Sequence, residues 1–199
     1  MFDLGNVLVD FDYGIAMQRI AARSDRSAGQ LRQFLKETSL AVRFETGRIT
    51  SEQFFAEVRG AIGFRGNLQE FSQYFSDIFT PNEPMVELHA SLRKHGIPAY
   101  IFSNTNALQI GYIRGRFPFF SRFDGYVYSF EHGVMKPNHG LYEVVERVTG
   151  LRGPEIIYLD DLPENVAAGT ARGWRSIRHE SPDASRAALA AAGLPTADD

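Results

Sequence analysis

The chain has 199 residues, 44% of them hydrophobic and 23% charged, a composition typical of a globular protein rather than a disordered one. A net charge of -3 gives no basic face for nucleic acid, and the absence of cysteine excludes disulfides, thiol nucleophiles and thiolate metal sites. No apolar run approaches membrane-spanning length and no signal peptide precedes the first strand. We therefore expect a cytoplasmic protein without nucleic-acid or membrane partners, either a monomer or a weak homodimer.

The chain begins with a short apolar stretch that reaches an acid within three residues. Residues 1–2 precede Asp3, and the apolar pattern then breaks at Gly5. An acid at the carboxyl end of a strand is typical of the sheet edge where open α/β folds place their chemistry. Because a buried strand usually has about 5–6 residues, the first strand is truncated or its natural start lies upstream. Residues 7–11 favour a small extended flap, and residues 13–22 favour a helix.

Residues 24–80 have a different character, because their apolar residues recur at helical spacing. Leu31 and Leu35, for example, lie one helical turn apart. Thr50 and Gln53 fit a capping box at the start of one helix. No convincing strand falls in this stretch, and its aromatic stripes are typical of a helical core. The stretch therefore predicts a small helical insertion.

After residue 80 the pattern changes to strands that alternate with helices. Repeated βα units favour a parallel sheet covered on both faces. We predict an α/β fold with a Rossmann-like core formed by residues 1–23 and 81–199 and a helical cap formed by residues 24–80. The strands are expected at 98–102, 126–129, 156–159 and 174–177, and the helices at 85–95, from 107 onward, and at 140–149 and 164–172.

Polar residues follow or neighbour the predicted strands, so they could meet at one sheet edge. Two aspartates there could share a hard divalent cation, and Mg²⁺ suits a few carboxylates together with a substrate phosphate. Without a metal, clustered carboxylates would repel one another, whereas a lysine would neutralise part of that charge. A carboxylate that attacks phosphorus forms an acyl phosphate, which divides one difficult step into two. The residues concerned are Asp3, Ser103, Asn104, Lys136, Asp160, Asp161 and Asn165.

Four stretches, taken together, resemble the four ordered motifs of the haloacid dehalogenase-like (HAD) hydrolase superfamily. Any one of them is weak evidence, but four in the right order are specific. The resemblance covers nearly the whole chain, with the helical insertion in the place of a C1-type cap. The form of the first motif, and Phe-Glu-Thr-Gly-Arg-Ile at 44–49, are most similar to the bacterial α-D-glucose-1-phosphate phosphatase branch. The four stretches are Phe-Asp-Leu-Gly-Asn-Val at 2–7, Ser-Asn-Thr-Asn at 103–106, Gly-Val-Met-Lys-Pro at 133–137 and Tyr-Leu-Asp-Asp-Leu-Pro-Glu-Asn at 158–165.

The resemblance implies a Mg²⁺ site at the start of the chain. Asp3 would be both nucleophile and metal ligand, and the Gly5 backbone carbonyl and Asp161 would be the other protein ligands. Asp160 and Asn165 would support these ligands from behind. The family's sheet order also places the first strand centrally, between the strands that end at Ser103 and Asp160.

The remaining residues of the motifs are implied to hold the substrate. Ser103 and Asn104 would bind the phosphoryl group, and Lys136 would hold both the nucleophile and the phosphate. The activity implied is a Mg²⁺-dependent phosphomonoesterase that forms a phospho-aspartate on Asp3. Its substrate would be a small phosphorylated metabolite, a sugar phosphate such as a hexose 1-phosphate.

One position departs from the usual pattern. Most phosphatases of the superfamily have a second aspartate two residues after the nucleophile, where it serves as general acid and base. Here that position is Gly5, which has no side chain. The departure leaves the proton donor unidentified.

Three alternatives remain open. A 2-haloacid dehalogenase would use Asp3 on carbon, but a second acid at Asp161 argues against it, because displacement of halide needs no metal. A phospho-receiver switch has a similar set of residues, but it carries the acidic pair before the phosphorylated aspartate. A non-catalytic phosphate-binding homologue is favoured by Gly5 and by the short first strand.

Overall fold

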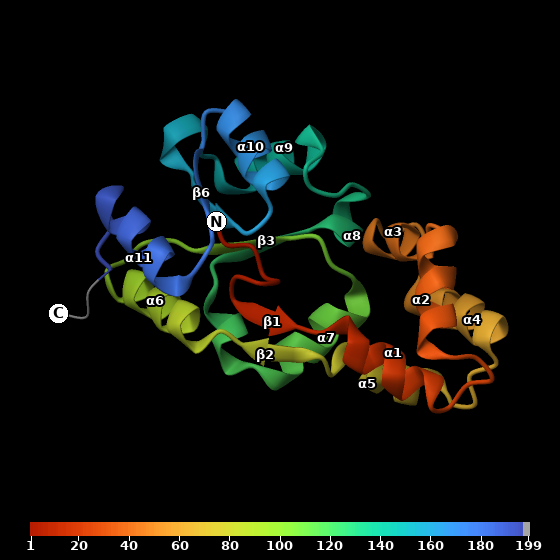
Figure 1. Ribbon diagram of the computed structural model, residues 1–199. Coiled ribbons are helices and arrows are strands. Elements are labelled where there is room, and N and C mark those ends of the chain that lie inside the picture. Colours follow the sequence, from red (N-terminus) through yellow and green to blue (C-terminus); the bar gives the residue numbers. More distant parts are fainter. Residues whose placement is uncertain (197–199) are drawn as a thin grey trace.

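The computed structural model describes residues 1–196 as a parallel sheet with helices on its faces and an all-helical region beside it (Figure 1). The strands of the sheet are β3 (Tyr100–Ser103), β4 (Gly125–Tyr128), β5 (Ile157–Asp160) and β6 (Arg175–Arg178). The helices around it are α6 (Glu83–Lys94), α7 (Ala107–Arg116), α8 (Ser129–His132), α9 (His139–Thr149), α10 (Pro163–Ala171) and α11 (Pro182–Ala191).

The strands are parallel, and the segment around Phe2 lies in the centre of the sheet. β3 pairs with β4, and β5 pairs with β6. Phe2 forms parallel bridges with Ile101 of β3 and Leu159 of β5, so the order is β4, β3, Phe2, β5, β6. The Phe2 N–H donates to the Tyr100 carbonyl at 2.9 Å, and the Asp3 N–H donates to the Leu159 carbonyl at 2.9 Å. The predicted α/β fold and the central place of the first segment are both confirmed.

Both faces of the sheet are covered, because successive strand residues point to opposite sides. Ile101 and Leu159 pack in one apolar cluster with residues of α6, α7 and α11. Their chain neighbours Phe102 and Tyr158 pack in a second cluster with residues of α9. Two apolar faces leave the strand ends as the places where polar groups can gather.

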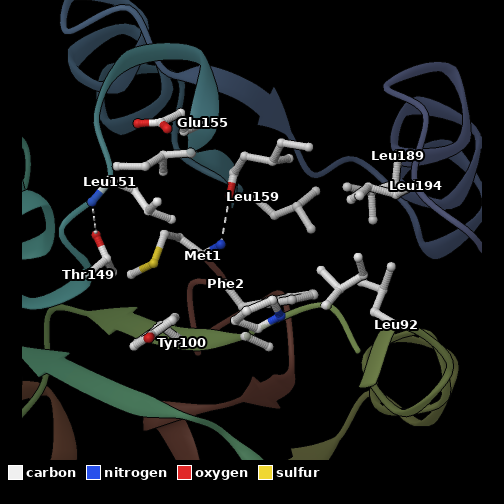
Figure 2. A pocket seen from close by; sticks show the side chains of 15 residues that line it. Met1, Phe2, Leu92, Tyr100, Thr149, Leu151, Glu155, Leu159, Leu189 and Leu194 are labelled. Carbon is white, nitrogen blue, oxygen red and sulfur yellow. Dashed lines mark hydrogen bonds between the residues drawn. The ribbon is translucent and has the colours of Figure 1, made fainter. Parts of the chain in front are cut away.

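A groove of about 270 Å³ lies next to Met1, where the central segment begins. The residues just before β3 and β5 form part of its wall (Figure 2). Its walls are largely apolar and include Leu92 and Leu189. The Met1 amino group donates to the Ile157 carbonyl at 2.6 Å.

The helical region has its own apolar core. Residues of all five of its helices share one cluster, in which the rings of Phe44 and Phe54 stack at 4.3 Å. Met17 and Ile20 of the first helix belong to this cluster, although the boundary predicted at residue 23 leaves that helix with the core. The division into core and cap therefore stays a prediction. The helices are α1 (Tyr13–Ala21), α2 (Ala28–Glu37), α3 (Leu40–Glu45), α4 (Ser51–Ile62) and α5 (Leu68–Ser76).

Two short strands connect the helical region to the sheet region. β1 (Val9–Phe11) is the predicted flap, and it pairs antiparallel with β2 (Phe79–Pro81). The prediction that residues 24–80 contain no strand was therefore wrong at the end of that stretch. A three-residue strand has too few residues to show an alternating pattern, and its partner lies about 70 residues earlier in the chain.

Local signals at helix starts were more reliable. The Thr50 hydroxyl accepts from the Gln53 N–H, and the Gln53 side chain accepts from the Thr50 N–H, so the predicted capping box is confirmed. The Asp12 side chain caps α1 by accepting from the Gly14 N–H at 2.7 Å. Within residues 1–196, every helix is too short or too polar to cross a membrane.

Candidate active site

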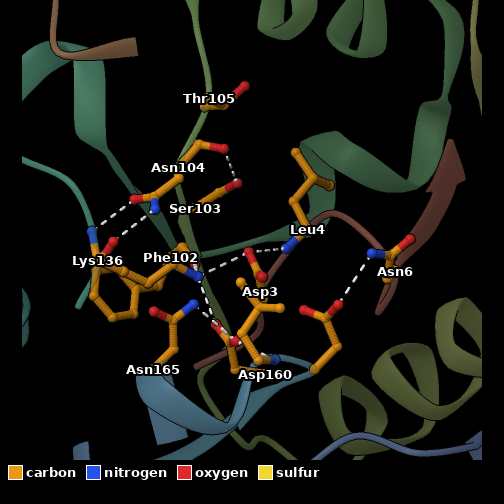
Figure 3. Close-up of polar contacts among 12 residues, drawn as sticks. Asp3, Leu4, Asn6, Phe102, Ser103, Asn104, Thr105, Lys136, Asp160 and Asn165 are labelled. Carbon is orange, nitrogen blue, oxygen red and sulfur yellow. Dashed lines mark hydrogen bonds and ion pairs between the residues drawn. The ribbon is translucent and has the colours of Figure 1, made fainter. Parts of the chain in front are cut away.

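The carboxyl ends of the central strands bring three of the predicted residues together (Figure 3). Asp3 directly follows Phe2, and Ser103 and Asp160 are the last residues of β3 and β5. All three are buried. The parallel register fixes this meeting, because strand ends on one side of a sheet lie side by side.

Lys136 enters the same place from the loop between α8 and α9. Its Nζ lies 2.9 Å from Asp3 Oδ1 and 2.6 Å from Asp160 Oδ2. The ammonium also donates to the Phe102 carbonyl at 2.9 Å, and it lies 5.0 Å from the centre of the Phe102 ring and 5.7 Å from that of Tyr158. A buried cation is thus held between two carboxylates and two aromatic rings.

The two carboxylates beside this lysine differ in their protonation. Burial, opposed by the attraction of Lys136 and assisted by the charge on Asp160, raises the pKa of Asp3 to about 7. Burial also acts to raise the pKa of Asp160, but the charge of Lys136 and hydrogen bonds from Lys136, Tyr158 and Asn165 hold it below its usual value. Burial acts to lower the pKa of Lys136, and the two carboxylates outweigh this effect and raise it.

Both carboxylate oxygens of Asp160 accept hydrogen bonds from protein donors. Its Oδ1 accepts from the Leu162 N–H at 2.9 Å and from Asn165 Nδ2 at 3.0 Å. Its Oδ2 accepts from Lys136 and from the Tyr158 hydroxyl. These contacts fix the loop after β5, which is a supporting role.

Asp161 is placed differently. It is half-buried, and its Oδ2 accepts from Asn6 Nδ2 at 3.0 Å. One carboxylate oxygen from each of Asp3, Asp160 and Asp161 lies within 4.8 Å of the others. Ligands on opposite sides of Mg²⁺ are about 4.2 Å apart, and the ion prefers hard oxygen donors. The donor set of this cluster therefore fits a magnesium ion.

The loop after β3 is tied to the lysine loop. Asn104 Nδ2 donates to the Lys136 carbonyl at 3.0 Å, and Asn104 Oδ1 accepts from the Lys136 N–H at 2.7 Å. The side-chain amide predicted to bind phosphate is therefore engaged in holding Lys136. The Ser103 hydroxyl lies 3.3 Å from the Asn104 carbonyl, beside the same loop.

The position that lacks an aspartate is filled by a neighbouring ring. A Cβ atom on Gly5 would lie 2.7 Å from Cε1 of Phe11, well inside contact distance. Phe11 belongs to the flap strand β1. An aromatic ring therefore occupies the space that a side chain at position 5 would need.

Sequence reasoning missed two residues that position the aspartates. Tyr158 lies two residues before Asp160, and residues two apart on a strand share a face, so strand periodicity could have identified it. Asn6, which holds Asp161, has a left-handed backbone with φ of 55°. Asparagine tolerates that conformation better than most residues, but the sequence carried no signal that its amide faces residue 161.

The chain was compared with protein families, with curated proteins and with solved structures. No family model matches the chain. The sesquiterpene phosphatase astK of Aspergillus oryzae is 29% identical to it over 133 residues, which cover 65% of this chain and 67% of that protein. The D-ribitol-5-phosphate phosphatase of Bacteroides thetaiotaomicron is 21% identical over 189 residues, which cover 91% of each chain.

Solved structures show the same fold. The HAD family enzyme BT-2542 of Bacteroides thetaiotaomicron superposes with a TM-score of 0.80 at 19% identity, covering 90% of this chain and 91% of that one. A complex of that enzyme with magnesium and inorganic phosphate superposes with a TM-score of 0.76 at 18% identity, covering 90% and 92%.

Fold and site together define the class, a Rossmann-like α/β fold whose site residues gather at the carboxyl edge of a parallel sheet. The chain shares the fold of these HAD family enzymes, and its four ordered motifs resemble those of the haloacid dehalogenase-like (HAD) hydrolase superfamily.

Proposed function

We propose that the chain is a Mg²⁺-dependent phosphomonoesterase that forms a phospho-aspartate on Asp3. One observation carries the proposal. A buried lysine, Lys136, bridges Asp3 and Asp160, with an oxygen of Asp161 close by. With a divalent cation bound to its carboxylates, a site of this kind can hold a phosphate next to a carboxylate, which is what phosphoryl transfer to aspartate needs.

The chain's own residues perform the first step as follows. The Asp3 carboxylate attacks phosphorus, the bond from phosphorus to the ester oxygen breaks, and the alcohol leaves with the electron pair and takes up a proton. Lys136 keeps Asp3 in place and offsets charge on the phosphoryl oxygens. The Ser103 hydroxyl and the Asn104 N–H hold those oxygens, whereas the Thr105 N–H donates to Ser129. In the second step water attacks the phospho-aspartate and releases phosphate and Asp3.

Asp3, the Gly5 carbonyl and Asp161 would hold Mg²⁺, which supplies positive charge next to the phosphoryl oxygens. The hydrogen bond from Asn6 orients Asp161 for this role. Asp160 and Asn165 hold the loop that presents Asp161.

The substrate is a small phosphorylated metabolite. The relatives named above act on a sesquiterpene phosphate and on D-ribitol 5-phosphate, which share the phosphate ester but not the alcohol. The motif resemblance supports a sugar phosphate such as a hexose 1-phosphate. The phosphate-binding residues serve all of these alike, so they do not select among them.

Phosphate release from a panel of phosphate esters, with Mg²⁺ and with EDTA, tests the proposal. We expect turnover that requires Mg²⁺, its loss in Asp3→Asn, and a fall of at least about 100-fold in Asp161→Ala. Asp183→Ala, which changes an exposed aspartate on α11, is the matched control and should retain activity. Full activity in EDTA, release of halide without phosphate, or phosphate binding with no turnover would each contradict the proposal.

A further inference from the structure

A second cavity of about 270 Å³ lies among the helices of the helical region and reaches the sheet region at Asn106. Most of its wall is apolar, and a few polar side chains reach it from different elements. Glu45, the last residue of α3, is half-buried there. Arg32 is exposed on α2. The apolar lining is Met17, Leu35, Ala41, Phe44, Phe54 and Phe75.

Two links along the chain and through aromatic rings place the cavity near the candidate active site. Asn106 lines it and follows Ser103 by three residues, and three residues of chain span at most about 11 Å. On the other side, the Phe11 ring touches the Gly5 position and lies 5.3 Å from the ring of Tyr13, which lines the cavity. Both links place the cavity within the neighbourhood of a phosphate bound at Asp3.

Several polar groups near the cavity are bonded to one another. The Tyr13 hydroxyl accepts from Gln109 Nε2 at 2.8 Å, and the Asn106 side-chain oxygen accepts from the Gln109 N–H at 3.1 Å. Glu45 differs, because burial raises its pKa to about 7. A carboxyl that holds its proton can both donate and accept a hydrogen bond.

Contact between the two regions fixes the place of Glu45. Gly47, two residues later, has φ of +63°, and a Cβ there would lie 2.0 Å from the Phe130 carbonyl oxygen of α8. The backbone after α3 therefore rests directly on the sheet region, which glycine alone allows at this separation. Glu45 therefore lies close to the boundary of the two regions.

We infer that this cavity receives the organic part of the phosphate ester, and that this part is an apolar alcohol with one further hydroxyl group, which binds the Glu45 carboxyl. The inference rests on the proposed function and selects a substrate class for it. A sugar carries several hydroxyls, and each one buried without a partner weakens binding. A hydrocarbon gains from leaving water for such a wall.

Two esters matched in shape and leaving group test the inference. Cyclohexylmethyl phosphate and glucose 6-phosphate both place a six-membered ring on a primary ester oxygen, but the first has no hydroxyls. We expect kcat/KM to be at least tenfold higher for cyclohexylmethyl phosphate, with the difference mainly in KM. Addition of a hydroxyl at ring position 4 should lower KM further in the unmodified protein but not in Glu45→Leu. Preference for the glucose ester, with both esters cleaved, would overturn the inference and leave the proposed function intact.

Binding of the free alcohols gives a measurement that needs no turnover. Ligand-observed NMR should show cyclohexylmethanol binding to the unmodified protein and at least tenfold weaker binding to Ala41→Phe, which fills the cavity. Val42→Phe places the same ring one residue along α3, at an exposed position, and should bind as the unmodified protein does. Equal binding by both variants would overturn the inference. Selective binding without any phosphate release would support the cavity and refute the proposed function.

Discussion

Replacement of Glu45 by glutamine should change how stability depends on pH. Burial raises the pKa of Glu45 from its ordinary value of 4.5 to about 7. Between these values the folded chain keeps a proton that the unfolded chain has lost, so the free energy of unfolding falls as pH rises. At about 1.4 kcal/mol per pH unit, the full effect is about 3 kcal/mol. Because water can enter the cavity and screen the charge, we expect about 1–3 kcal/mol.

Urea denaturation at pH 5 and pH 8 measures this effect. Relative to the unmodified protein, Glu45→Gln should gain about 1–3 kcal/mol at pH 8 over its value at pH 5. Asp3, whose pKa is raised in the same direction, is present in both proteins, so its contribution cancels in the comparison. Glu87→Gln, at an exposed position on α6, is the control and should show no such pH dependence. Equal pH dependence in the Glu45 variant and the unmodified protein would refute the reasoning.

Three further predictions concern other parts of the molecule. Gly5→Asp alone should be destabilised by about 1–3 kcal/mol, because its side chain meets the Phe11 ring. In the unmodified protein, the single-turnover phosphorylation rate should depend steeply on leaving-group acidity. The double variant with Gly5→Asp and Phe11→Ala should flatten this dependence. A flat series in the unmodified protein would show that a proton donor is already present. Asn6→Ala should weaken Mg²⁺ binding about 10–100-fold by calorimetry, because Asp161 loses its orienting hydrogen bond. His89 is buried, and burial lowers its pKa from 6.5 to about 4. Between these values the unfolded chain binds a proton that the folded chain does not, so the free energy of unfolding should fall by up to about 3 kcal/mol from pH 7 to pH 4. Thermal melts of His89→Leu should lack that fall.

The residues predicted from motifs were the ones that the parallel sheet itself brings together. Asp3, Ser103 and Asp160 each end a strand segment, and strands in one parallel sheet end at one edge, so the order of motifs along the chain implies their meeting in space. Capping residues such as Thr50 were predictable for a related reason, since their partners lie within one turn.

Features that depend on contacts between distant segments were not predictable. Separation along the sequence does not show which of these segments lie close together in the fold. Examples are the Phe11 ring beside Gly5, the packing of α1 with the helical region, and the pairing of β1 with β2. The side chain of Asn104 was assigned to phosphate because its neighbour Ser103 suited that role. The structure shows instead that its amide matches the Lys136 backbone, a complementarity that a linear pattern does not contain.

The bridging position of Phe2 has a consequence for how the protein can fail. The pairs β3–β4 and β5–β6 are joined through this residue, and Asp3 comes directly after it. Ser103 ends the strand on one side of Phe2, and Asp160 ends the strand on the other. Partial unfolding that breaks the pairing of Phe2 with β3 or with β5 would separate Ser103 from Asp160. The pairs β3–β4 and β5–β6 could remain intact during this event. Catalytic competence therefore reports on the continuity of the sheet, and a chain can lose function while most of its secondary structure persists.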